Sequence, residues 1–384
     1  MHGKVRMGKL LRALGLMSGT SMDGIDLALI ETDGENQVAR RQHGSCAYPP
    51  EFRARLRAAL ADARLLTDRI ARPGCLADVE RALTERHAEA VSAFLSEHGI
   101  RAADVDVIGF HGQTVLHRPA VPGDFGVPSP GLTVQLGDGG LLARLTGIDV
   151  VYDLRAADVA AGGQGAPLAP VYHRALAARL PQRPVAFLNI GGVANVTWVG
   201  ENGRLIAFDT GPGNALMDDW ALRHTGRACD VDGELARSGK ADEEVLRQYL
   251  MHPYLERPVP KSLDRNDFTL DLVEGLSAAD GAATLAELTA VAVARSLSWL
   301  PAPPALWLVT GGGRRNKHIM ELLAWHLEAP VAPVEAVDLD GDSMEAEAWA
   351  YLAVRSLASL PITYPETTGA PRPLTGGVLA PAPK

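Results

Sequence analysis

Residues 15–26 read Gly-Leu-Met-Ser-Gly-Thr-Ser-Met-Asp-Gly-Ile-Asp, and this stretch decides the interpretation of the fold. One apolar run leads into it from Leu10 and another continues from it to Ile30, a pattern that predicts two strands joined by a tight loop. Glycine permits backbone angles that other residues avoid, so such a loop can turn N–H groups and hydroxyls toward a phosphate. The small and hydroxyl residues of the loop are Ser18, Gly19, Thr20, Ser21 and Gly24.

Two acidic residues, Asp23 and Asp26, complicate the phosphate interpretation. Their carboxylates would repel a phosphate directly, and a bridging Mg²⁺ would reconcile the charges. The alternative is an ordinary hairpin rich in serine and glycine, because short glycine motifs often match by chance. From this loop alone, both interpretations stay open.

The bulk composition indicates a globular enzyme with two domains. A chain of 384 residues is too long for one typical core. Its contents of 47% hydrophobic and 22% charged residues are ordinary for a globular protein. The net charge of −9 disfavours a nucleic acid as partner, because binding along a phosphate backbone requires clustered lysine and arginine.

The three cysteines, Cys46, Cys75 and Cys229, are widely spaced and lie in no CxxC pair or His/Cys cluster. We expect neither a disulfide framework nor a zinc site, and free thiols indicate a reducing compartment. The sequence has no run of about 18 apolar residues that would span a membrane, and residues 1–11 lack the apolar region of a signal peptide. We therefore expect a cytoplasmic protein with no membrane partner.

Predicted strands and helices alternate along the chain, which gives an α/β class. Two strand–loop–strand units, near residues 14–30 and 186–199, resemble the starts of two related halves. Further strands are predicted at 104–110, 132–136, 148–152 and 306–309, and helices within 51–98, 139–145, 285–300 and 316–327.

Four loops of small residues follow apolar strands, at 18–24, 189–195, 209–214 and 311–313. Ligands in open α/β sheets collect at the carboxyl ends of strands, so four such loops favour a ligand site where one alone would indicate a turn. The loop at 311–313 opens a helix and can present N–H groups to a nucleotide. It lacks Gly-x-Gly-x-x-Gly spacing, and the chain has no Walker loop, which disfavours dinucleotide and P-loop chemistry.

The strongest candidate for catalysis is Asp209, which ends an apolar strand and precedes Thr-Gly-Pro-Gly-Asn. A carboxylate at a strand end faces a cleft and can remove a proton within hydrogen-bond reach. The competing role is to cap the helix that begins near Asn214 or to satisfy the turn. Asp218 and Asp219 lie on that helix and are predicted to be solvated.

Further side chains are candidates for contacts with a ligand. His111 closes a predicted strand in His-Gly-Gln-Thr, where Thr114 adds a hydroxyl; a satisfied structural histidine is the alternative. Arg155 has a guanidinium fork that suits a carboxylate, or it forms a surface salt bridge. Glu345 begins an apolar helix, as a substrate contact or as an ordinary acid of the first turn. The segment 260–262, Pro-Lys-Ser, receives no role from this reasoning.

Assembled, these loops resemble those of the anhydro-N-acetylmuramic acid kinase family, in the sugar kinase, actin and chaperone ATPase superfamily. The resemblance spans about Leu14 to Ala380, nearly the whole chain. Family members often carry a run of arginines where residues 153–158 keep one. The motifs that carry the resemblance are GLMSGTSMDGID (15–26), HGQT (111–114), AGGQGAPL (161–168), LNIGGVAN (188–195), FDTGPGN (208–214), PKS (260–262) and GGG (311–313).

The resemblance implies a two-lobed actin-like and sugar-kinase ATPase fold, with a duplicated mixed-sheet core and an interlobe cleft. Residues 8–153 with 366–384 would form the first lobe, and 154–365 the second. The implied reaction uses ATP and Mg²⁺. Water opens 1,6-anhydro-N-acetylmuramic acid, and O6 takes the γ-phosphoryl group to give N-acetylmuramic acid 6-phosphate in cell-wall recycling. We expect a homodimer that acts on this small amino sugar.

By motif, the resemblance makes Asp209 the base that activates the attacking water, and Asp26 a ligand of Mg²⁺ through water. The residues expected to bind the sugar are His111, Thr114, Arg155 and Glu345. Those expected to bind ATP are Gly19, Thr20, Ser21, Met22, Asp23, Gly24, Ile25, Asp26, Gly191, Gly192, Asn195, Gly311, Gly312 and Gly313.

Two other functions remain as alternatives. A plain sugar or acid kinase of the same superfamily would use Asp209 to activate a substrate hydroxyl instead of water. A nucleotide switch of the actin or chaperone type would bind a protein as its output. The polar set around His111 and Glu345 disfavours the switch.

Overall fold

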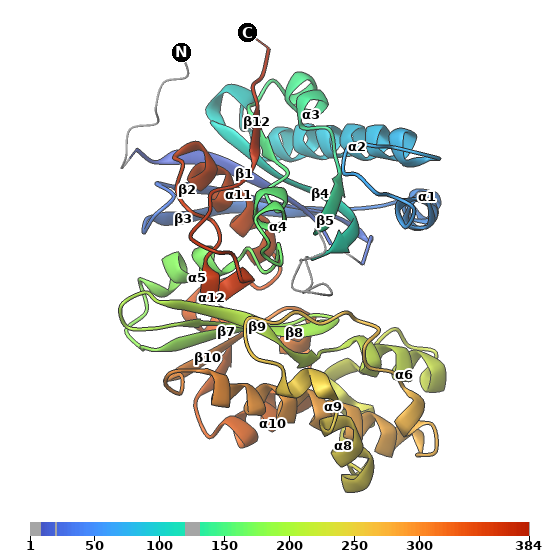
Figure 1. The fold of residues 1–384 in the computed structure, drawn as a ribbon. Coiled ribbons are helices and arrows are strands. Elements are labelled where there is room, and N and C mark those ends of the chain that lie inside the picture. Colours follow the sequence, from blue (N-terminus) through green and yellow to red (C-terminus); the bar gives the residue numbers. More distant parts are fainter. Residues whose placement is uncertain (1–8, 20, 120–130, 384) are drawn as a thin grey trace, which may run out of the picture. The chain divides into compact units, whose positions relative to one another are not determined.

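The computed structural model describes residues 9–19, 21–119 and 131–383, and it divides into two compact units. Unit 1 comprises Met1–Ala178 together with Ser343–Lys384, and unit 2 comprises Arg179–Asp342. Each unit packs helices against a mixed sheet of its own (Figure 1). The sequence predicted lobe boundaries at 153/154 and 365/366. That prediction placed 154–178 and 343–365 in the second lobe, whereas the structure places both segments in unit 1.

Unit 1 is built on a seven-stranded sheet. Its strands are β1 (Leu11–Ser18), β2 (Gly24–Thr32), β3 (Val38–Ala47), β4 (Val107–Arg118), β5 (Leu132–Leu136), β6 (Val150–Tyr152) and β12 (Val378–Ala380). They lie in the order β12-β6-β4-β1-β2-β3, and β5 pairs with β4. The helices are α1 (Pro50–Ala63), α2 (Leu76–Glu97), α3 (Gly139–Thr146), α4 (Ala156–Ala160), α5 (Pro170–Ala177), α11 (Met344–Leu357) and α12 (Pro365–Thr368).

Unit 2 is built on a five-stranded sheet in the order β11-β10-β7-β8-β9. Its strands are β7 (Val185–Ile190), β8 (Val193–Val199), β9 (Leu205–Pro212), β10 (Leu306–Thr310) and β11 (Val331–Pro333). Its α-helices are α6 (Ala215–Thr225), α7 (Glu234–Arg237), α8 (Glu243–Leu250), α9 (Ala278–Arg295) and α10 (Lys317–Leu327).

The two sheets share one topology. In unit 1, β1, β2 and β3 form an antiparallel meander, and β4 and then β6 add in parallel beyond β1. In unit 2, β7, β8 and β9 form the meander, and β10 and then β11 add in parallel beyond β7. The related halves predicted from residues 14–30 and 186–199 are confirmed, since each predicted hairpin opens one of these sheets.

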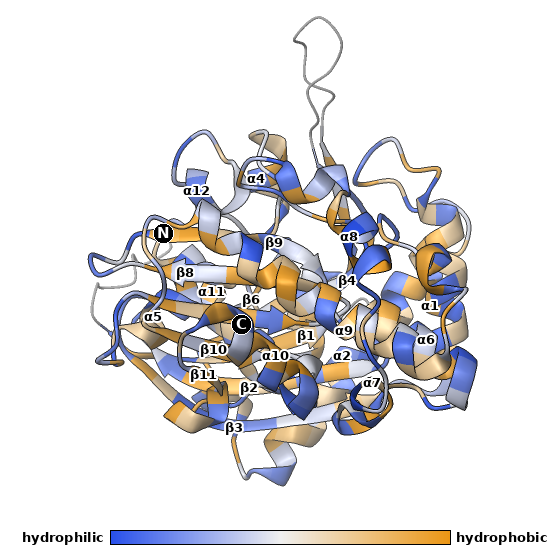
Figure 2. Cartoon of the chain, turned by 90° about the horizontal axis from the view of Figure 1, so that it is seen from below, coloured by the Kyte–Doolittle hydropathy of each residue, from blue (hydrophilic) through white to orange (hydrophobic). Residues whose placement is uncertain are grey.

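Each unit encloses an apolar core between its sheet and its helices. Phe52 of α1 and Leu83 of α2 belong to the core of unit 1, while Trp220 of α6 and Trp307 of β10 belong to that of unit 2. The helices are amphipathic, so hydrophobic and hydrophilic residues alternate along α6 and α10 in Figure 2. Burial of these apolar faces is the main favourable term in the folding of both units.

Helix α11 lies directly on two glycines of adjacent strands. Gly15 of β1 pairs with Gly109 of β4. A Cβ atom on Gly15 would stand 1.7 Å from Ala346 O, and one on Gly109 would stand 2.1 Å from Trp349 O. No larger residue fits at either position, so Gly15 opens the motif at 15–26 because a helix backbone crosses it.

Two predicted element boundaries are wrong. The strand predicted to end at Phe110 continues in β4 to Arg118 because it pairs there with β5, so 111–114 lies within a strand. The helix predicted to start at residue 285 begins at Ala278, since the Ser277 hydroxyl accepts the N–H of Asp280 and caps it.

Candidate functional site

The loop between β1 and β2 has its first hydroxyl turned into the core. Ser18 Oγ lies 2.6 Å from the Tyr48 hydroxyl and 3.2 Å from His87 Nε2. It also donates to Gly24 O at 3.2 Å, and its side chain is fully buried. The prediction that the Ser18 hydroxyl faces a phosphate is therefore wrong, because these contacts use it to join the strand ends to the helical layer.

The accessible part of the same loop is acidic. Ser21 donates to Asp23 Oδ1 at 2.8 Å, and both residues are exposed, as is Asp26. Met22 adopts a φ of 55°, and its N–H donates to Gly19 O at 3.2 Å, which closes a tight turn. The described residues of the turn therefore present the Ser21 hydroxyl and the carboxylates of Asp23 and Asp26 to solvent, an oxygen-rich set that suits hydrated Mg²⁺.

The remaining residues predicted in this loop differ in what they can offer. Thr20 lies outside the described residues. Ile25 is buried in the core, so only its backbone is available to a ligand. Gly24 pairs with Ala47 of β3, and a Cβ on it would stand 2.5 Å from Cys46 O. Glycine is required there by the sheet itself.

His111 and Arg155 meet over Trp349 in unit 1. His111 Nε2 lies 3.3 Å from Arg155 Nη2, and His111 Nδ1 lies 2.6 Å from Gly112 O. The imidazole centroid is 4.7 Å from the Trp349 ring, and the guanidinium carbon is 5.2 Å from it. Burial and then the Arg155 charge lower the pKa of His111 to about 3, so the imidazole is neutral at pH 7.

A buried carboxylate fixes the segment that holds Arg155. Asp158 accepts from Gly165 N and from Thr368 Oγ1, each at 2.7 Å, while Arg155 Nη1 donates to Gly165 O at 2.8 Å. Burial lowers the pKa of Arg155 to about 10, and the charges of Glu345 and Asp158 oppose that effect. Arg155 is thus a partly buried cation at pH 7, and a surface salt bridge does not describe it.

Glu345 and Thr114 complete the set predicted to bind the sugar. Glu345 lies in the first turn of α11. Loss of water around it raises its pKa, and the Arg155 charge lowers it. Thr114 Oγ1 accepts from Gln135 Nε2 at 3.5 Å. All four predicted residues belong to unit 1, and Arg155 interacts with both His111 and Glu345.

Glu347 is a buried acid that the sequence reasoning missed. It accepts from Arg40 Nε at 2.8 Å and from the Tyr172 hydroxyl at 2.6 Å. The Ser343 hydroxyl donates to it at 2.9 Å. These bonds anchor the first turn of α11, which carries Glu345. Arg40 and Tyr172 are remote in the sequence, so no local pattern marks these two partners.

Asp209 is partly buried within β9 and is held by backbone groups. The prediction that Asp209 ends its strand is wrong, because β9 continues to Pro212 through pairing with β8. Its Oδ2 accepts from Leu263 N at 2.8 Å, its N–H donates to Lys261 O at 3.0 Å, and Tyr254 OH donates to its carbonyl at 2.7 Å. Among the described residues, Oδ1 has no hydrogen-bond partner. Burial raises the pKa of Asp209 to about 7, and the Leu263 N–H opposes that shift.

These contacts decide between the roles considered for Asp209. Helix α6 starts after Asn214 with no side-chain cap, so Asp209 does not cap it. On that helix Asp219 is exposed and pairs with Arg265 at 3.1 Å, as a solvated acid should. The prediction is wrong for Asp218, which is partly buried; burial and then the Asp219 charge raise its pKa to about 6.

A row of polar residues crosses the sheet of unit 2 and includes Asp209. Thr310 of β10 pairs with Asn189 of β7, Asn189 pairs with Asn195 of β8, and Asn195 pairs with Asp209. Directly opposed residues on neighbouring strands project to the same face. The row therefore places Asn195, which was predicted to bind nucleotide, beside the candidate base.

The glycine loops of unit 2 pack on one another. Gly191 O accepts from Asn214 N at 2.7 Å, and Gly192 O accepts from Gly213 N at 3.0 Å, which joins the loops at 189–195 and 209–214. Gly311 has a φ of 73°, and a Cβ on it would stand 2.3 Å from Asn189 Oδ1. Three loops predicted separately thus form one surface of backbone groups.

The helix predicted after residues 311–313 is confirmed as α10, whose N-terminus is capped by Asn316. A short 3₁₀ turn at Gly312–Arg315 intervenes, so the glycines do not open α10 directly. Gly313 is packed against Ile190, whereas a Cβ on Gly312 would meet only Asn214 Nδ2, at 3.4 Å. Gly312 is therefore the more open of the two.

Lys261 supplies the contact that holds the 260–262 segment against Asp209. Its buried ammonium donates to Leu255 O at 2.9 Å and to Tyr254 O at 3.2 Å. It also lies 4.9 Å from the Tyr254 ring and 5.4 Å from the Trp299 ring. The segment without a role in the sequence reasoning is thus a support for the candidate base.

We expect Lys261→Met to lower the free energy of unfolding by about 2 kcal/mol, because two charge-assisted hydrogen bonds and two cation–π contacts are lost. Chemical denaturation measures this change. Lys317→Met is the matched control, since Lys317 is largely exposed and pairs with Asp232 at 3.0 Å. Equal stability of the two variants would contradict the support role.

The described residues contain no group of three or more His, Cys, Asp or Glu side chains placed to hold a metal ion. No helix among these residues is both long and apolar enough to cross a bilayer. All three cysteines, predicted to be free thiols, form no disulfide.

The chain is similar to known proteins over almost its full length. The family model for anhydro-N-acetylmuramic acid kinase matches residues 11–382. A protein of that name from Methylobacterium nodulans is 53% identical over 96% of this chain and 100% of its own length. Another from Rhodospirillum rubrum is 55% identical over 96% of this chain and 94% of its own length.

Among solved structures, component A of (R)-2-hydroxyglutaryl-CoA dehydratase from Acidaminococcus fermentans aligns with 91% of this chain and 99% of its own, at 11% identity and a TM-score of 0.46. The full-length match to the family and the identities above 50% are what establish relationship. The chain belongs to the anhydro-N-acetylmuramic acid kinase family.

Proposed function

We propose that this chain is an ATP-dependent kinase that opens 1,6-anhydro-N-acetylmuramic acid with water and phosphorylates O6. The products are N-acetylmuramic acid 6-phosphate and ADP, in the recycling of cell-wall fragments. The observation that carries the proposal is Asp209, with one oxygen held by Leu263 N–H, the other without a partner among the described residues, and a pKa of about 7. The names of the relatives support the substrate.

Asp209 takes a proton from a water molecule as the water oxygen bonds to C1 of the sugar. The C1–O6 bond breaks, and O6 bonds to the γ-phosphorus as the bond to the β–γ bridging oxygen of ATP breaks. The proton stays on Asp209, and ADP leaves with the charge of the bridging oxygen. O6 needs no separate acid, because phosphorus captures it.

Residues of unit 1 are proposed to hold the substrates. The turn at Gly19–Asp26 offers N–H groups and the Ser21 hydroxyl to phosphates, with Asp26 facing Mg²⁺ through water. When bound, Mg²⁺ neutralises charge on the phosphates. The cation of Arg155 offers guanidinium N–H groups to sugar oxygens. The neutral imidazole of His111 is proposed to line the same site, with Nδ1 bonded to Gly112 O and Nε2 facing Arg155 Nη2. The Glu345 carboxylate is proposed to accept a hydrogen bond from a sugar hydroxyl.

Residues of unit 2 are proposed to bind the adenosine part of ATP and to place the base. Gly191, Gly192 and Asn195 flank Asp209 through the packed loops and the polar row. Gly311, Gly312 and Gly313 offer a backbone surface without side chains, of which Gly312 is the most open. A planar base can approach such a backbone closely.

Incubation with ATP, the anhydro sugar and ¹⁸O-labelled water tests the reaction. We expect one label at C1 of the phosphorylated product and none in the phosphate, because water attacks carbon and O6 attacks phosphorus. A plain sugar kinase, the nearest alternative, would transfer phosphate without any label in the sugar. A phosphorylated product that is still an anhydro sugar would therefore contradict the proposal.

We further propose that the protein works in the cytoplasm as a homodimer. The free state of all three cysteines supports a reducing compartment. The resemblance to the family supports the dimer. We expect sedimentation equilibrium to give the mass of two chains of 40.7 kDa each, and the mass of one chain would contradict the dimer.

A further inference from the structure

A cavity in unit 1 is lined by His111 and by two arginines that the proposed function does not use. Arg69 and Arg72 come from the segment between α1 and α2 and face Gln135 of β5 and Asp153, which follows β6. His111 also contacts Arg155, so the cavity adjoins the residues proposed to bind the sugar. Its polar lining suits a polar group of a ligand.

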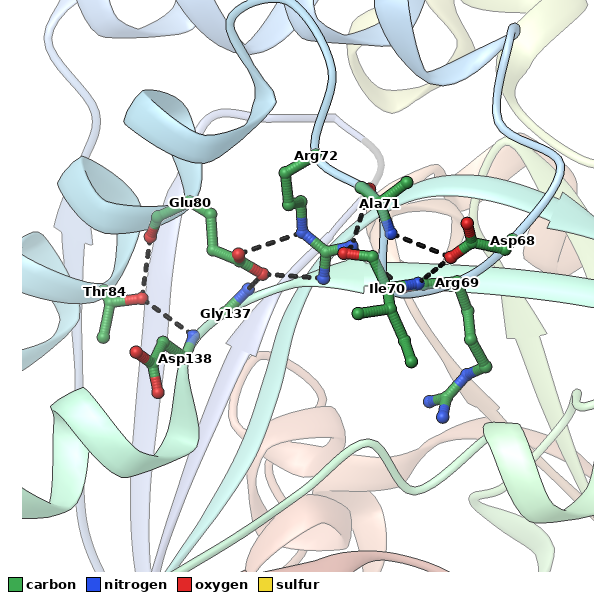
Figure 3. Close-up of polar contacts among 9 residues, drawn as sticks. All are labelled: Asp68, Arg69, Ile70, Ala71, Arg72, Glu80, Thr84, Gly137 and Asp138. Carbon is green, nitrogen blue, oxygen red and sulfur yellow. Dashed lines mark hydrogen bonds and ion pairs between the residues drawn. The ribbon is translucent and has the colours of Figure 1, made fainter.

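Arg72 uses its guanidinium to fold the segment. Its Nε and Nη2 donate to the two oxygens of Glu80 at 2.9 Å each, and its Nη1 donates to Arg69 O at 2.8 Å. Glu80 also accepts from Gly137 N at 3.0 Å. Figure 3 shows this network, with Asp68 accepting the N–H groups of the next turn. Arg72 is therefore a structural residue.

The guanidinium of Arg69 forms fewer hydrogen bonds than that of Arg72. Its Nη2 pairs with Asp153, and its Nε and Nη1 have no hydrogen-bond partner among the described residues. Its side chain is 46% exposed. In Figure 3 its guanidinium points away from Arg72 and Glu80. A guanidinium has five N–H donors in a planar fork that matches a carboxylate, so Arg69 retains the capacity to bind one.

We propose that Arg69 binds the carboxylate of the lactyl arm of the substrate, an inference that rests on the proposed function. Asp153, with a φ of 57° just before Leu154 and Arg155, orients the Arg69 guanidinium through Nη2. The remaining donors grip the carboxylate at the mouth of the cavity. Arg69 then determines specificity for an acidic sugar, while His111, Arg155 and Glu345 hold the ring.

The test compares the acid with its neutral isostere, in which the lactyl carboxylate is replaced by a carboxamide. Titration calorimetry on the full-length protein gives Kd for both sugars, with and without the change Arg69→Met. We expect the unchanged protein to bind the acid 10- to 100-fold more tightly, about the worth of charge-assisted hydrogen bonds. Arg69→Met removes this preference.

Arg81→Met is the control, because Arg81 is an exposed cation on α2 that pairs with Glu85 at 3.7 Å. It should keep the preference for the acid. A preference that survives in Arg69→Met, or a Kd that rises equally for acid and amide, overturns the assignment and indicates a merely structural ion pair. A protein that consumes no anhydro sugar with ATP overturns the proposed function itself, which the labelling experiment detects separately.

Discussion

Replacing Asp209 with asparagine is expected to lower kcat by about 10³-fold while ATP still binds with unchanged Kd. General-base catalysis contributes about 10²- to 10⁴-fold, and asparagine keeps the shape and the Leu263 hydrogen bond but cannot take a proton. Single-turnover kinetics and nucleotide titration measure the two quantities. Asp219→Asn is the control, since Asp219 is an exposed acid on α6. Near-normal turnover in Asp209→Asn would refute the base assignment.

The pH dependence of kcat should also identify Asp209 as the base. Because the base must be deprotonated and burial raises its pKa to about 7, kcat of the unchanged protein should fall about tenfold per unit below pH 7 and level off above it. Asp209→Asn should lose this limb. A profile flat between pH 5 and 8 would mean that no group of this pKa takes the proton.

The raised pKa also predicts the sign of a stability change. The folded pKa of about 7 lies above the ordinary value of 3.8, so the native state binds more protons than the unfolded state between these pH values. The free energy of unfolding therefore declines as pH rises through this window. Asp209→Asn should raise Tm at pH 8, with a smaller gain at pH 5.

Replacing Gly15 with alanine is expected to destabilise unit 1 by about 3 kcal/mol or more and to lower its Tm by about 5–10 °C. The added Cβ would stand 1.7 Å from Ala346 O and 2.7 Å from Ala350 N, both of them backbone atoms of α11. A backbone cannot rotate aside as a side chain can, so the whole helix must shift. Glu345 would move with it, and affinity for the sugar should fall as well.

Gly44→Ala is the matched control for that change. Gly44 lies in β3 of the same sheet, and a Cβ there would meet Phe94 Cδ2 at an ordinary 3.5 Å. We expect a change in Tm of about 1 °C or less, because alanine also restricts the unfolded chain. Differential scanning calorimetry compares the two variants. A Gly15→Ala protein as stable as Gly44→Ala would contradict direct contact between α11 and β1.

The sequence correctly predicted the structural features that depend on neighbouring residues. The two hairpins and the helix capped by Asn316 follow from runs of neighbouring residues. The α/β class and the repeated sheet topology follow from the order of those runs. The division between the units was less accessible, because it depends on which strands a helix covers.

Long-range contacts explain what the sequence left unassigned. The burial of Ser18 depends on Tyr48 and His87, and that of Glu347 on Arg40 and Tyr172. Nothing near Ser18 or Glu347 in the sequence distinguishes a buried polar group from an exposed one. The same holds for Arg69, whose partner Asp153 lies on another element.

Because α11 comes from residues 344–357, the ribosome must deliver nearly the entire polypeptide before Gly15 and Gly109 receive their covering helix. Unit 2 is continuous in the sequence, so it can fold during synthesis, before the strands of unit 1 are covered by α11. A truncated chain that ends before residue 344 should therefore contain a folded unit 2 and an incompletely folded unit 1. We expect chaperones to bind unit 1 and proteases to degrade it.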